Sequence, residues 1–288
     1  MSFNNHTKLL TLIGAPLSQS YAYRMQNAAY ETAGLSYHYF YTEADDKHLK
    51  EIINGIKHIP AFAGCAVTKP NKIKVLEYLD ELDPLCQKMG ACNTVVKLPD
   101  GRLKGYNTDG TGFIKAIDSE INVKDKRIFC FGAGGAGRAI CSALAFCGAK
   151  EIIITDVISD AAFGLCQDIN SNFAPIAKSM GGNDFSMIKE CDMLINASGI
   201  GMGKTVGKTP LPDIWINKDQ FCFDACYNPI KTQFLIDAEK KGCKIMNGLT
   251  MSLYQGAEQI ELWTGKQAPI DIMREELLKI LEEQSNGN

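Results

Sequence analysis

Residues 129–139 read FCFGAGGAGRA and carry the spacing G-x-G-x-x-G at Gly132, Gly134 and Gly137. An apolar run before them predicts a buried strand, and small residues after them predict a helix. The first glycine permits a tight turn, the second lets the backbone approach a pyrophosphate, and the third lets the helix pack close to its strand. Free N–H groups at the helix start favour phosphate binding. The predicted dinucleotide-binding residues of this stretch are Gly132, Gly134, Gly135, Ala136 and Gly137.

An acidic residue follows the next predicted strand, Glu151–Thr155. Asp156 lies 19 positions after Gly137, where a carboxylate accepts hydrogen bonds from the adenosine ribose of NAD. An ordinary β-α-β crossover with a surface aspartate is the alternative explanation. No Lys or Arg lies between Val157 and Phe163 to bind a 2′-phosphate, so the sequence favours NAD over NADP, with NADP still possible.

Composition narrows the class of protein. The chain has 288 residues, which predicts two domains, and 45% hydrophobic residues against 22% charged ones, which is enough for a normal core. The net charge is −3 and no basic block occurs, which argues against nucleic acid or an anionic membrane as partner. No apolar run is long enough to span a bilayer and the first residues are polar, so we expect a cytoplasmic protein. Eleven cysteines and four histidines lack metal-ligand spacing, and no metal site is predicted.

Strands and helices alternate along the chain, which predicts an α/β fold with largely parallel sheets. Further strands are predicted at Leu9–Ile13, Tyr37–Tyr41, Phe62–Val67, Met193–Asn196 and Phe221–Asp224, and a hairpin at Asn93–Leu98 and Leu103–Tyr106. Helices are predicted at Met25–Ala33, Asp46–Lys57, Pro70–Leu79 and Thr111–Ile117, and from Ser252 onward. The glycine motif lies in the middle of the chain, so a substantial region precedes the nucleotide-binding part.

Ligands of open α/β sheets bind beyond the carboxyl ends of the strands, and two candidate proton-transfer residues follow such ends. Lys72 is predicted in the first turn of a helix after one strand, and Asp109 comes just after another. A lysine near an aspartate in a cleft can exchange a proton with a substrate hydroxyl. The residues alone leave open that Lys72 is a solvated surface charge and Asp109 a helix cap.

Seven segments, taken in order, resemble the shikimate/quinate dehydrogenase family nearly end to end. The matching segments are V-T-x-P-x-K at Val67–Lys72, G-A-x-N-T at Gly90–Thr94, G-x-N-T-D-x-x-G at Gly105–Gly112, the glycine motif at Gly132–Ala139, N-A-S-x-x-G-M at Asn196–Met202, D-x-x-Y-x-P at Asp224–Pro229, and G-x-x-M with Q-G-A at Gly248–Ala257. Seven motifs in one order are far more specific than any one of them.

The resemblance implies hydride transfer between NAD and a ring hydroxyl of shikimate/3-dehydroshikimate or quinate/3-dehydroquinate, with Lys72 and Asp109 as the catalytic pair. It implies substrate contacts by Ser20, Thr68, Asn93, Tyr227 and Gln255, and further cofactor contacts by Asn196, Ala197 and Gly248. It also implies a Rossmann-type domain inserted into an α/β substrate domain. The expected boundaries are 1–108 and 248–288 for the substrate domain and 109–247 for the NAD-binding domain. The expected partner is a small cyclic hydroxy acid, and the expected assembly is a monomer or a homodimer.

The chain departs from the family pattern near its start. The residues that match are Gly14, Pro16, Gln19, Ser20, Gln26 and Asn27. Ala22 replaces the second serine of the family's S-x-S-P, and Tyr23 replaces its proline. That serine pair grips the substrate carboxylate in the family, so a modified shikimate-like acid is an alternative substrate. A non-catalytic NAD-binding regulatory protein is a second alternative.

Two further features compete with this interpretation or leave it open. Tyr227 and Lys231 have the Y-x-x-x-K spacing of short-chain dehydrogenases, but Pro229 between them disfavours a shared helix face. The glycine-rich run Gly199–Gly207 is either a cofactor lid or a plain surface loop.

Overall fold

A computed structural model describes residues 4–17, 20–181 and 185–286. Contacts divide the chain into a first unit, Met1–Thr108 with Leu253–Asn288, and a second unit, Asp109–Ser252. The second unit is therefore inserted into the first. Two helices cross the boundaries along the chain: α4 (Thr108–Ile117) begins at the last residue before the insertion, and α8 (Gly248–Thr264) ends in the first unit.

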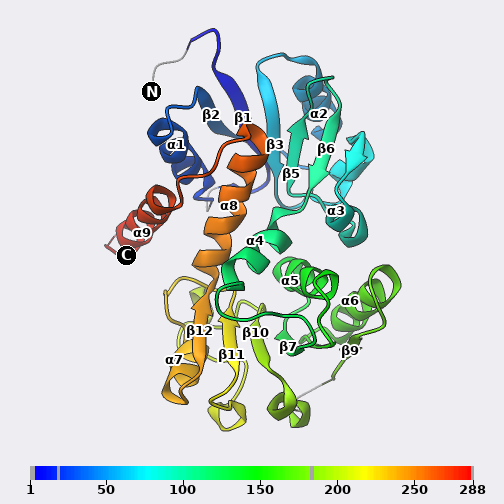
Figure 1. The fold of residues 1–288 in the computed structure, drawn as a ribbon, viewed down its shortest axis with the longest axis vertical. Coiled ribbons are helices and arrows are strands. Elements are labelled where there is room, and N and C mark those ends of the chain that lie inside the picture. The colour runs from blue at the N-terminus through cyan, green and yellow to red at the C-terminus, as the bar shows by residue number, and fades with distance from the viewer. Residues whose placement is uncertain (1–3, 18–19, 182–184, 287–288) are drawn as a thin grey trace. The chain divides into compact units, whose positions relative to one another are not determined.

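The first unit is built on a six-stranded mixed sheet in the order β2-β1-β3-β5-β6-β4 (Figure 1). Its strands are β1 (Lys8–Gly14), β2 (Tyr37–Glu43), β3 (Phe62–Val67), β4 (Glu81–Leu82), β5 (Thr94–Lys97) and β6 (Leu103–Tyr106). β1 pairs in parallel with β2 and β3, whereas β5 is antiparallel to β3 and to β6. The predicted hairpin is confirmed by the last of these pairings.

Helices cover the sheet of the first unit on both faces. They are α1 (Ala22–Thr32), α2 (Leu49–His58), α3 (Pro84–Met89), the second part of α8, and α9 (Ile270–Asn286). Leu49, Ile53 and Ile56 of α2 pack on one face with Ile13 and Val67. On the other face α8 comes close to the strands, because Trp263 donates its indole N–H to Val95 O. α9 lies beside α1 (Figure 1), and Arg24 pairs with Glu276 there.

The second unit has an all-parallel sheet in the order β12-β11-β10-β7-β8-β9 (Figure 1). Its strands are β7 (Arg127–Phe131), β8 (Glu151–Thr155), β9 (Ala177–Ser179), β10 (Met193–Asn196), β11 (Phe221–Asp224) and β12 (Lys244–Asn247). Numbered within the unit, that order is 6-5-4-1-2-3, the order of dinucleotide-binding doubly wound sheets. The predicted α/β fold with an inserted Rossmann-type domain is confirmed.

Side chains on β7 alternate between two hydrophobic cores. Ile128 and Cys130 face the helices α4, α5 (Gly135–Phe146) and α6 (Ser159–Asn172), whereas Phe129 and Phe131 face α7 (Gln233–Lys240) and the loops near it. A parallel strand that is buried on both faces reads as a continuous apolar run. This is why the run before Gly132 marked the central strand.

One predicted helix is wrong. Pro70–Leu79 forms a turn followed by a short 3₁₀ helix at Lys74–Tyr78, and the Lys69–Pro70 peptide is cis. The carbonyl of Lys72, which an α-helix would use internally, instead accepts the N–H of Cys92 at 2.8 Å. A tertiary backbone bond therefore replaces the helical one, and Lys72 lies in a turn.

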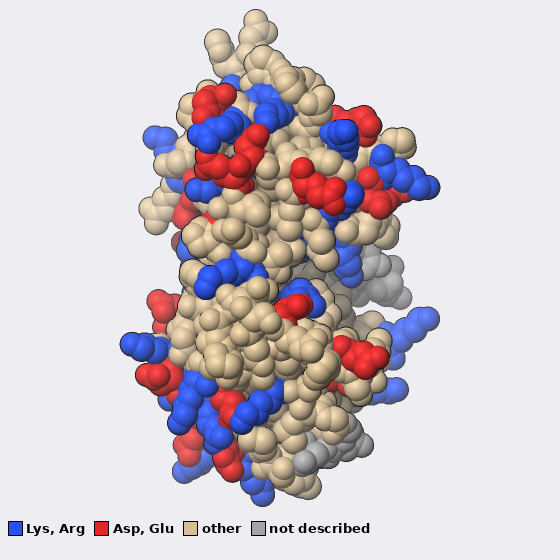
Figure 2. Space-filling view, turned by 90° about the vertical axis from the view of Figure 1, so that its right-hand side faces the viewer, with Lys and Arg blue, Asp and Glu red and all other residues tan. Residues whose placement is uncertain are grey.

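Acidic and basic side chains are interspersed in small groups over the face shown in Figure 2. None of the described helices combines the length and apolar character that a membrane span requires.

Candidate active site

Asn93 is the centre of a buried hydrogen-bond network in the first unit. Its Oδ1 accepts the backbone N–H of Thr108 at 2.7 Å and the hydroxyl of Thr94 at 2.9 Å. Its Nδ2 donates to Thr108 Oγ1 at 3.0 Å. All three residues are at most 3% exposed. Because buried polar groups are costly when unpaired, these bonds fix the side chain of Asn93. Asn93 directly precedes β5, and its backbone bonds Val67 and Tyr106, the last residues of β3 and β6.

The network continues along α8 and into α1. Gln255 Nε2 lies 3.4 Å from Thr108 Oγ1, and Gln259 Nε2 donates to Thr94 Oγ1 at 2.9 Å. Gln26 donates to Gln259 Oε1 at 3.2 Å and accepts the Tyr30 hydroxyl at 3.0 Å. Gln259 is not among the residues predicted from the sequence, although it follows Gln255 by one helical turn and so shares its face. Gln26 matches the family pattern but is not predicted as a site residue.

Backbone bonds tie the two candidate proton-transfer residues to this network. The carbonyl of Lys72 accepts the N–H of Cys92, the residue before Asn93. Asp109 directly follows Thr108, whose N–H is bound by Asn93, so its Cα is about 3.8 Å from that of Thr108. Both side chains are half-buried. Lys72 belongs to the first unit, and Asp109 is the first residue of the second.

Two other predicted substrate residues lie near strand ends of the first unit. Thr68 directly follows β3, donates its N–H to Ile13 O at 2.8 Å and is half-buried. Ser20 lies two residues before α1, and its Oγ accepts the N–H of Ala22 at 3.4 Å. Gln19 lies outside the described residues.

The glycine turn of the second unit has the close backbone approaches that its sequence predicts. Gly132 has a φ of +103°, and a Cβ there would lie 2.6 Å from Ala197 O. A Cβ on Gly137 would lie 2.0 Å from Gly132 O. Gly134 is the N-cap of α5, and Gly135 is its first residue. By contrast, a Cβ on Gly134 or Gly135 would meet nothing within 4 Å, so this side of the turn is open toward a ligand.

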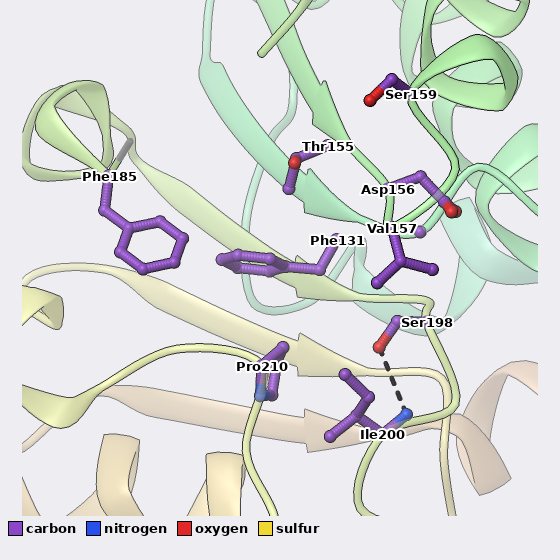
Figure 3. Close-up of a pocket in the computed structure, with 10 residues that line it drawn as sticks. Phe131, Thr155, Asp156, Val157, Ser159, Phe185, Ser198, Ile200 and Pro210 are labelled. Atoms are coloured by element: carbon purple, nitrogen blue, oxygen red, sulfur yellow. Dashed lines mark hydrogen bonds between the residues drawn. The ribbon is translucent and has the colours of Figure 1, made fainter. Parts of the chain in front are cut away.

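A pocket of about 390 Å³ opens beside this turn in the second unit (Figure 3). Its lining residues are Phe131, Gly132, Thr155, Asp156, Val157, Ser159, Phe185, Ser198, Ile200 and Pro210. Phe131 and Phe185 lie at one end, whereas Val157, Ser198 and Ile200 lie at the other (Figure 3). These ten described residues include no Lys or Arg.

Asp156 lies at the edge of this pocket and binds the glycine turn. Its Oδ2 accepts the N–H of Ala133 at 2.7 Å, and its Oδ1 accepts the N–H of Ile158 at 2.8 Å. A carboxylate has about four lone-pair sites, so each oxygen can accept one more hydrogen bond. The side chain can therefore order the turn and still accept ribose hydroxyls.

Asn196 ends β10 and is fully buried, with every polar atom of its side chain engaged. Its Nδ2 donates to Ile200 O and to Asp224 Oδ2, and its Oδ1 accepts the Ser198 hydroxyl at 2.6 Å. Burial raises the pKa of the Asp224 carboxyl, while hydrogen bonds from Thr232 and Asn196 act in the opposite direction. Asn196 thus shapes the loop that lines the pocket, and Ala197 lies against Gly132 as described above.

Three further residues of the predicted motifs follow the strands β11 and β12, namely Tyr227, Lys231 and Gly248. Gly248 begins α8, and a Cβ there would lie 2.0 Å from Ala225 O, so this glycine permits a close backbone approach. Tyr227 is half-buried and precedes a cis Asn228–Pro229 peptide. Lys231 is outside any helix and pairs with Glu239, so the short-chain dehydrogenase arrangement is absent.

Hydrogen bonds within the Gly199–Gly207 loop link its own residues. Thr205 Oγ1 donates toward Met202 O and accepts the N–H of Gly201. Within the described parts of the chain, no three His, Cys, Asp or Glu side chains gather as metal ligands. All eleven cysteines are free thiols.

Comparisons with known proteins place the chain in a family. Residues 12–95 match the model of the shikimate dehydrogenase substrate binding domain, and residues 248–278 match the shikimate 5'-dehydrogenase C-terminal domain. A shikimate dehydrogenase (NADP(+)) of Moorella thermoacetica is 35% identical over 285 residues, which cover 98% of this chain and 96% of that protein.

Solved structures agree with this assignment. Shikimate 5-dehydrogenase of Listeria monocytogenes, in complex with shikimate and NAD, has a TM-score of 0.91 at 36% identity, covering 96% of this chain and 98% of that one. Quinate dehydrogenase of Corynebacterium glutamicum, in complex with NAD, has a TM-score of 0.89 at 29% identity, covering 95% and 99%. The chain belongs to the shikimate dehydrogenase family.

Proposed function

We propose that the protein is an oxidoreductase that transfers a hydride between NAD and a ring hydroxyl of shikimate/3-dehydroshikimate or quinate/3-dehydroquinate. The observation that carries this proposal is the buried network around Asn93. It fixes amide and hydroxyl groups in place and ties the backbones of Lys72 and Thr108 to one segment. A site built of fixed polar groups rejects analogues that leave those groups unpaired, as selection among ring hydroxyls requires.

Lys72 and Asp109 are proposed as the proton-transfer pair. When NAD is bound, its nicotinamide supplies the hydride acceptor, and the chain supplies the group that removes the hydroxyl proton. Lys72 Nζ would exchange that proton, and the Asp109 carboxylate would orient the ammonium. Thr68, Asn93 and Gln255 would contact ring hydroxyls together with Tyr227, and Ser20 would bind the carboxylate.

The residues at the glycine turn fit a dinucleotide. A Cβ on Gly132 or Gly137 would collide with backbone, whereas the open positions Gly134 and Gly135 leave room for a pyrophosphate at the start of α5. NAD rather than NADP is proposed as the preferred cofactor, because Asp156 borders a pocket whose described lining holds no cation. A carboxylate accepts from ribose hydroxyls but repels a 2′-phosphate.

The organisation proposed with this function assigns 1–108 and 248–288 to substrate binding and 109–247 to NAD binding. The division of the chain by contacts, which changes unit between Thr108 and Asp109 and again between Ser252 and Leu253 inside α8, supports this organisation. We further propose a cytoplasmic monomer or homodimer.

The test is a steady-state assay of reduced cofactor formation with shikimate and quinate, each with NAD and NADP. Turnover of either acid with a higher kcat/KM for NAD supports the whole proposal. Turnover with NADP preferred would overturn only the cofactor assignment. Binding of NAD without turnover of either acid would instead identify a non-catalytic regulatory protein.

A further inference from the structure

The Tyr41 hydroxyl joins two backbone groups at the entrance to α1. It donates to the carbonyl of Ser20 at 2.7 Å and accepts the N–H of Tyr23 at 3.2 Å. Tyr41 lies on β2, so its hydroxyl links this strand to the start of α1. The Tyr23 ring also packs edge-on against the Tyr41 ring, with centroids 5.9 Å apart.

The bond from the Tyr23 N–H to the Tyr41 hydroxyl depends on a feature of this sequence. Where the family pattern has proline, this chain has Tyr23, and only a non-proline residue has an N–H in this position. The first N–H groups of a helix have no partner within the helix, so they require an outside acceptor. The N-cap residue Tyr21 makes no side-chain cap bond, and Ser20 Oγ accepts the N–H of Ala22, the first residue of α1. Tyr41 supplies the acceptor for Tyr23.

Neighbouring bonds hold the chain on both sides of Ser20. Glu43, two positions from Tyr41 and therefore on the same face of β2, accepts the N–H of Leu17 through Oε2 at 3.2 Å. Asn27 of α1 bonds both the N–H and the carbonyl of Tyr39, at 2.9 and 2.8 Å. The side chains of Tyr41 and Glu43, together with the backbone edge of β2 at Tyr39, thus hold the backbone on either side of Ser20.

We propose that Tyr41 is a positioning residue for substrate binding, which sets the place of Ser20 so that its hydroxyl can donate to the substrate carboxylate. This inference rests on the proposed function, in which Ser20 binds that carboxylate. With Ala22 in place of the second family serine, Ser20 carries more of this contact, and an error in its position is less well compensated. Tyr41 acts through Ser20 and does not touch the reacting atoms.

The variant Tyr41→Phe keeps the ring and removes both hydroxyl bonds. We expect the KM for shikimate, or for quinate if that is the acid turned over, to rise roughly three- to tenfold, as the loss of one net hydrogen bond would give. The kcat and the KM for NAD should stay within about twofold, because the carboxylate contact is equal in ground and transition states. The matched control is Tyr37→Phe on the same strand, which loses a hydroxyl bond to Trp263 O and should leave all three constants unchanged.

A double-mutant cycle with Ser20→Ala separates positioning from a general structural role. Tyr41→Phe should raise KM in the wild-type background and add little in the Ser20→Ala background. Equal effects in both backgrounds, or equal KM values for the two tyrosine variants, would overturn the inference while leaving the proposed function intact. If the wild-type protein turns over neither acid, the proposed function fails and the inference fails with it. Circular dichroism of each variant identifies any loss of folding.

Discussion

The two units prepare for their ligands in different ways. The first holds side-chain amides and hydroxyls in a buried network, from Asn93 through Thr108 to Gln255 and Gln259. The second presents backbone N–H groups and glycines without side chains, beside a pocket lined by apolar and polar residues. A ring with several hydroxyls can be distinguished from its isomers only by donors and acceptors in fixed places. A pyrophosphate needs only N–H groups and space, which any backbone can offer.

This difference predicts where each unit is vulnerable. The first unit should lose function when a polar atom is removed, with little effect on cofactor affinity. The second should lose function when an atom is added at a glycine. The experiments below test that contrast, from the largest expected effect to the smallest.

Lys72→Ala should have the largest effect. General acid–base assistance is typically worth about 10²–10⁴-fold, so kcat should fall by that factor while the KM for NAD changes little. The measurement is steady-state turnover at saturating cofactor. Lys74→Ala is the control, because Lys74 lies two residues on and pairs with Glu77 at the surface. If Lys72→Ala retained more than about a tenth of wild-type turnover, Lys72 would not be the proton-transfer residue.

Gly137→Ala should show the opposite sensitivity in the second unit. The added Cβ would lie 2.0 Å from Gly132 O, which belongs to the backbone and can yield only by moving the turn. We expect a loss of about 1–3 kcal/mol of stability, typical of overpacking, and at least tenfold weaker NAD binding. Thermal melting and cofactor titration measure the two effects.

Gly164→Ala is the matched control for that experiment. Gly164 lies within α6, where a Cβ meets nothing within 4 Å. Alanine there should stabilise the helix by about 0.5–1 kcal/mol and leave NAD binding unchanged. Equal behaviour of the two alanine variants would show that the close approach at Gly137 has no role.

The same contrast explains how much the sequence could predict. The Rossmann-type unit could be recognised from local patterns, because Ile128–Phe131 is buried on both faces and the glycines keep a fixed spacing. The predicted helix at Pro70–Leu79 failed because the carbonyl of Lys72 bonds to Cys92, a contact between segments that no local pattern records. The short strand β9 has only three residues and gives almost no periodic signal.

The same difference between local patterns and contacts of distant segments decides which site residues could be predicted. Asn93 and Gln255 lie in motifs that resemble the family's, so they could be named in advance. Gln259 could not, because its role depends on α1 and α8 packing together, and an isolated glutamine in a helical pattern predicts a solvent-exposed residue. Gln26 matches the family pattern, but its bond to Gln259 required the structure. The double role of Asp156, which binds the turn as well as bordering the pocket, also required the structure.

Asp156→Asn tests the one charged side chain among the described residues that line the pocket of the second unit. The wild-type protein should have a higher kcat/KM with NAD than with NADP. Removing the charge should reduce that preference roughly tenfold, because a full charge a few ångströms from a phosphate is worth more than about 1 kcal/mol near a protein surface. Asp168→Asn, which lies on α6 and pairs with Arg138, is the control. A wild-type preference for NADP would refute the assignment.

Ala22→Ser adds a hydroxyl where the family pattern has one and tests whether side-chain donors limit recognition in the first unit. A hydrogen bond to a charged group is worth roughly 1.5–3 kcal/mol, but part of it would be lost in ordering the new side chain. We therefore expect the KM for shikimate to fall by up to about tenfold with little change in kcat. An unchanged or higher KM would show that another group already binds that carboxylate oxygen.

The smallest effect is expected at the opposite end of the second unit's sheet, where charges serve stability instead of binding. Glu151, the first residue of β8, pairs with Lys178 and with Arg127, and these bonds lower the pKa of its carboxyl. A lowered pKa contributes stability above the unfolded-state value of about 4.3 and loses it as pH falls through the folded-state value. Glu151→Gln should therefore cost about 0.5–1 kcal/mol at neutral pH. The difference from wild type should shrink in acid, and NAD affinity should not change, because the pocket lies at the other end of the strand. Denaturant titrations across pH measure the free energy of unfolding of both proteins. Weaker NAD binding by the variant would contradict the assignment of stability to one end of the sheet and of cofactor binding to the other.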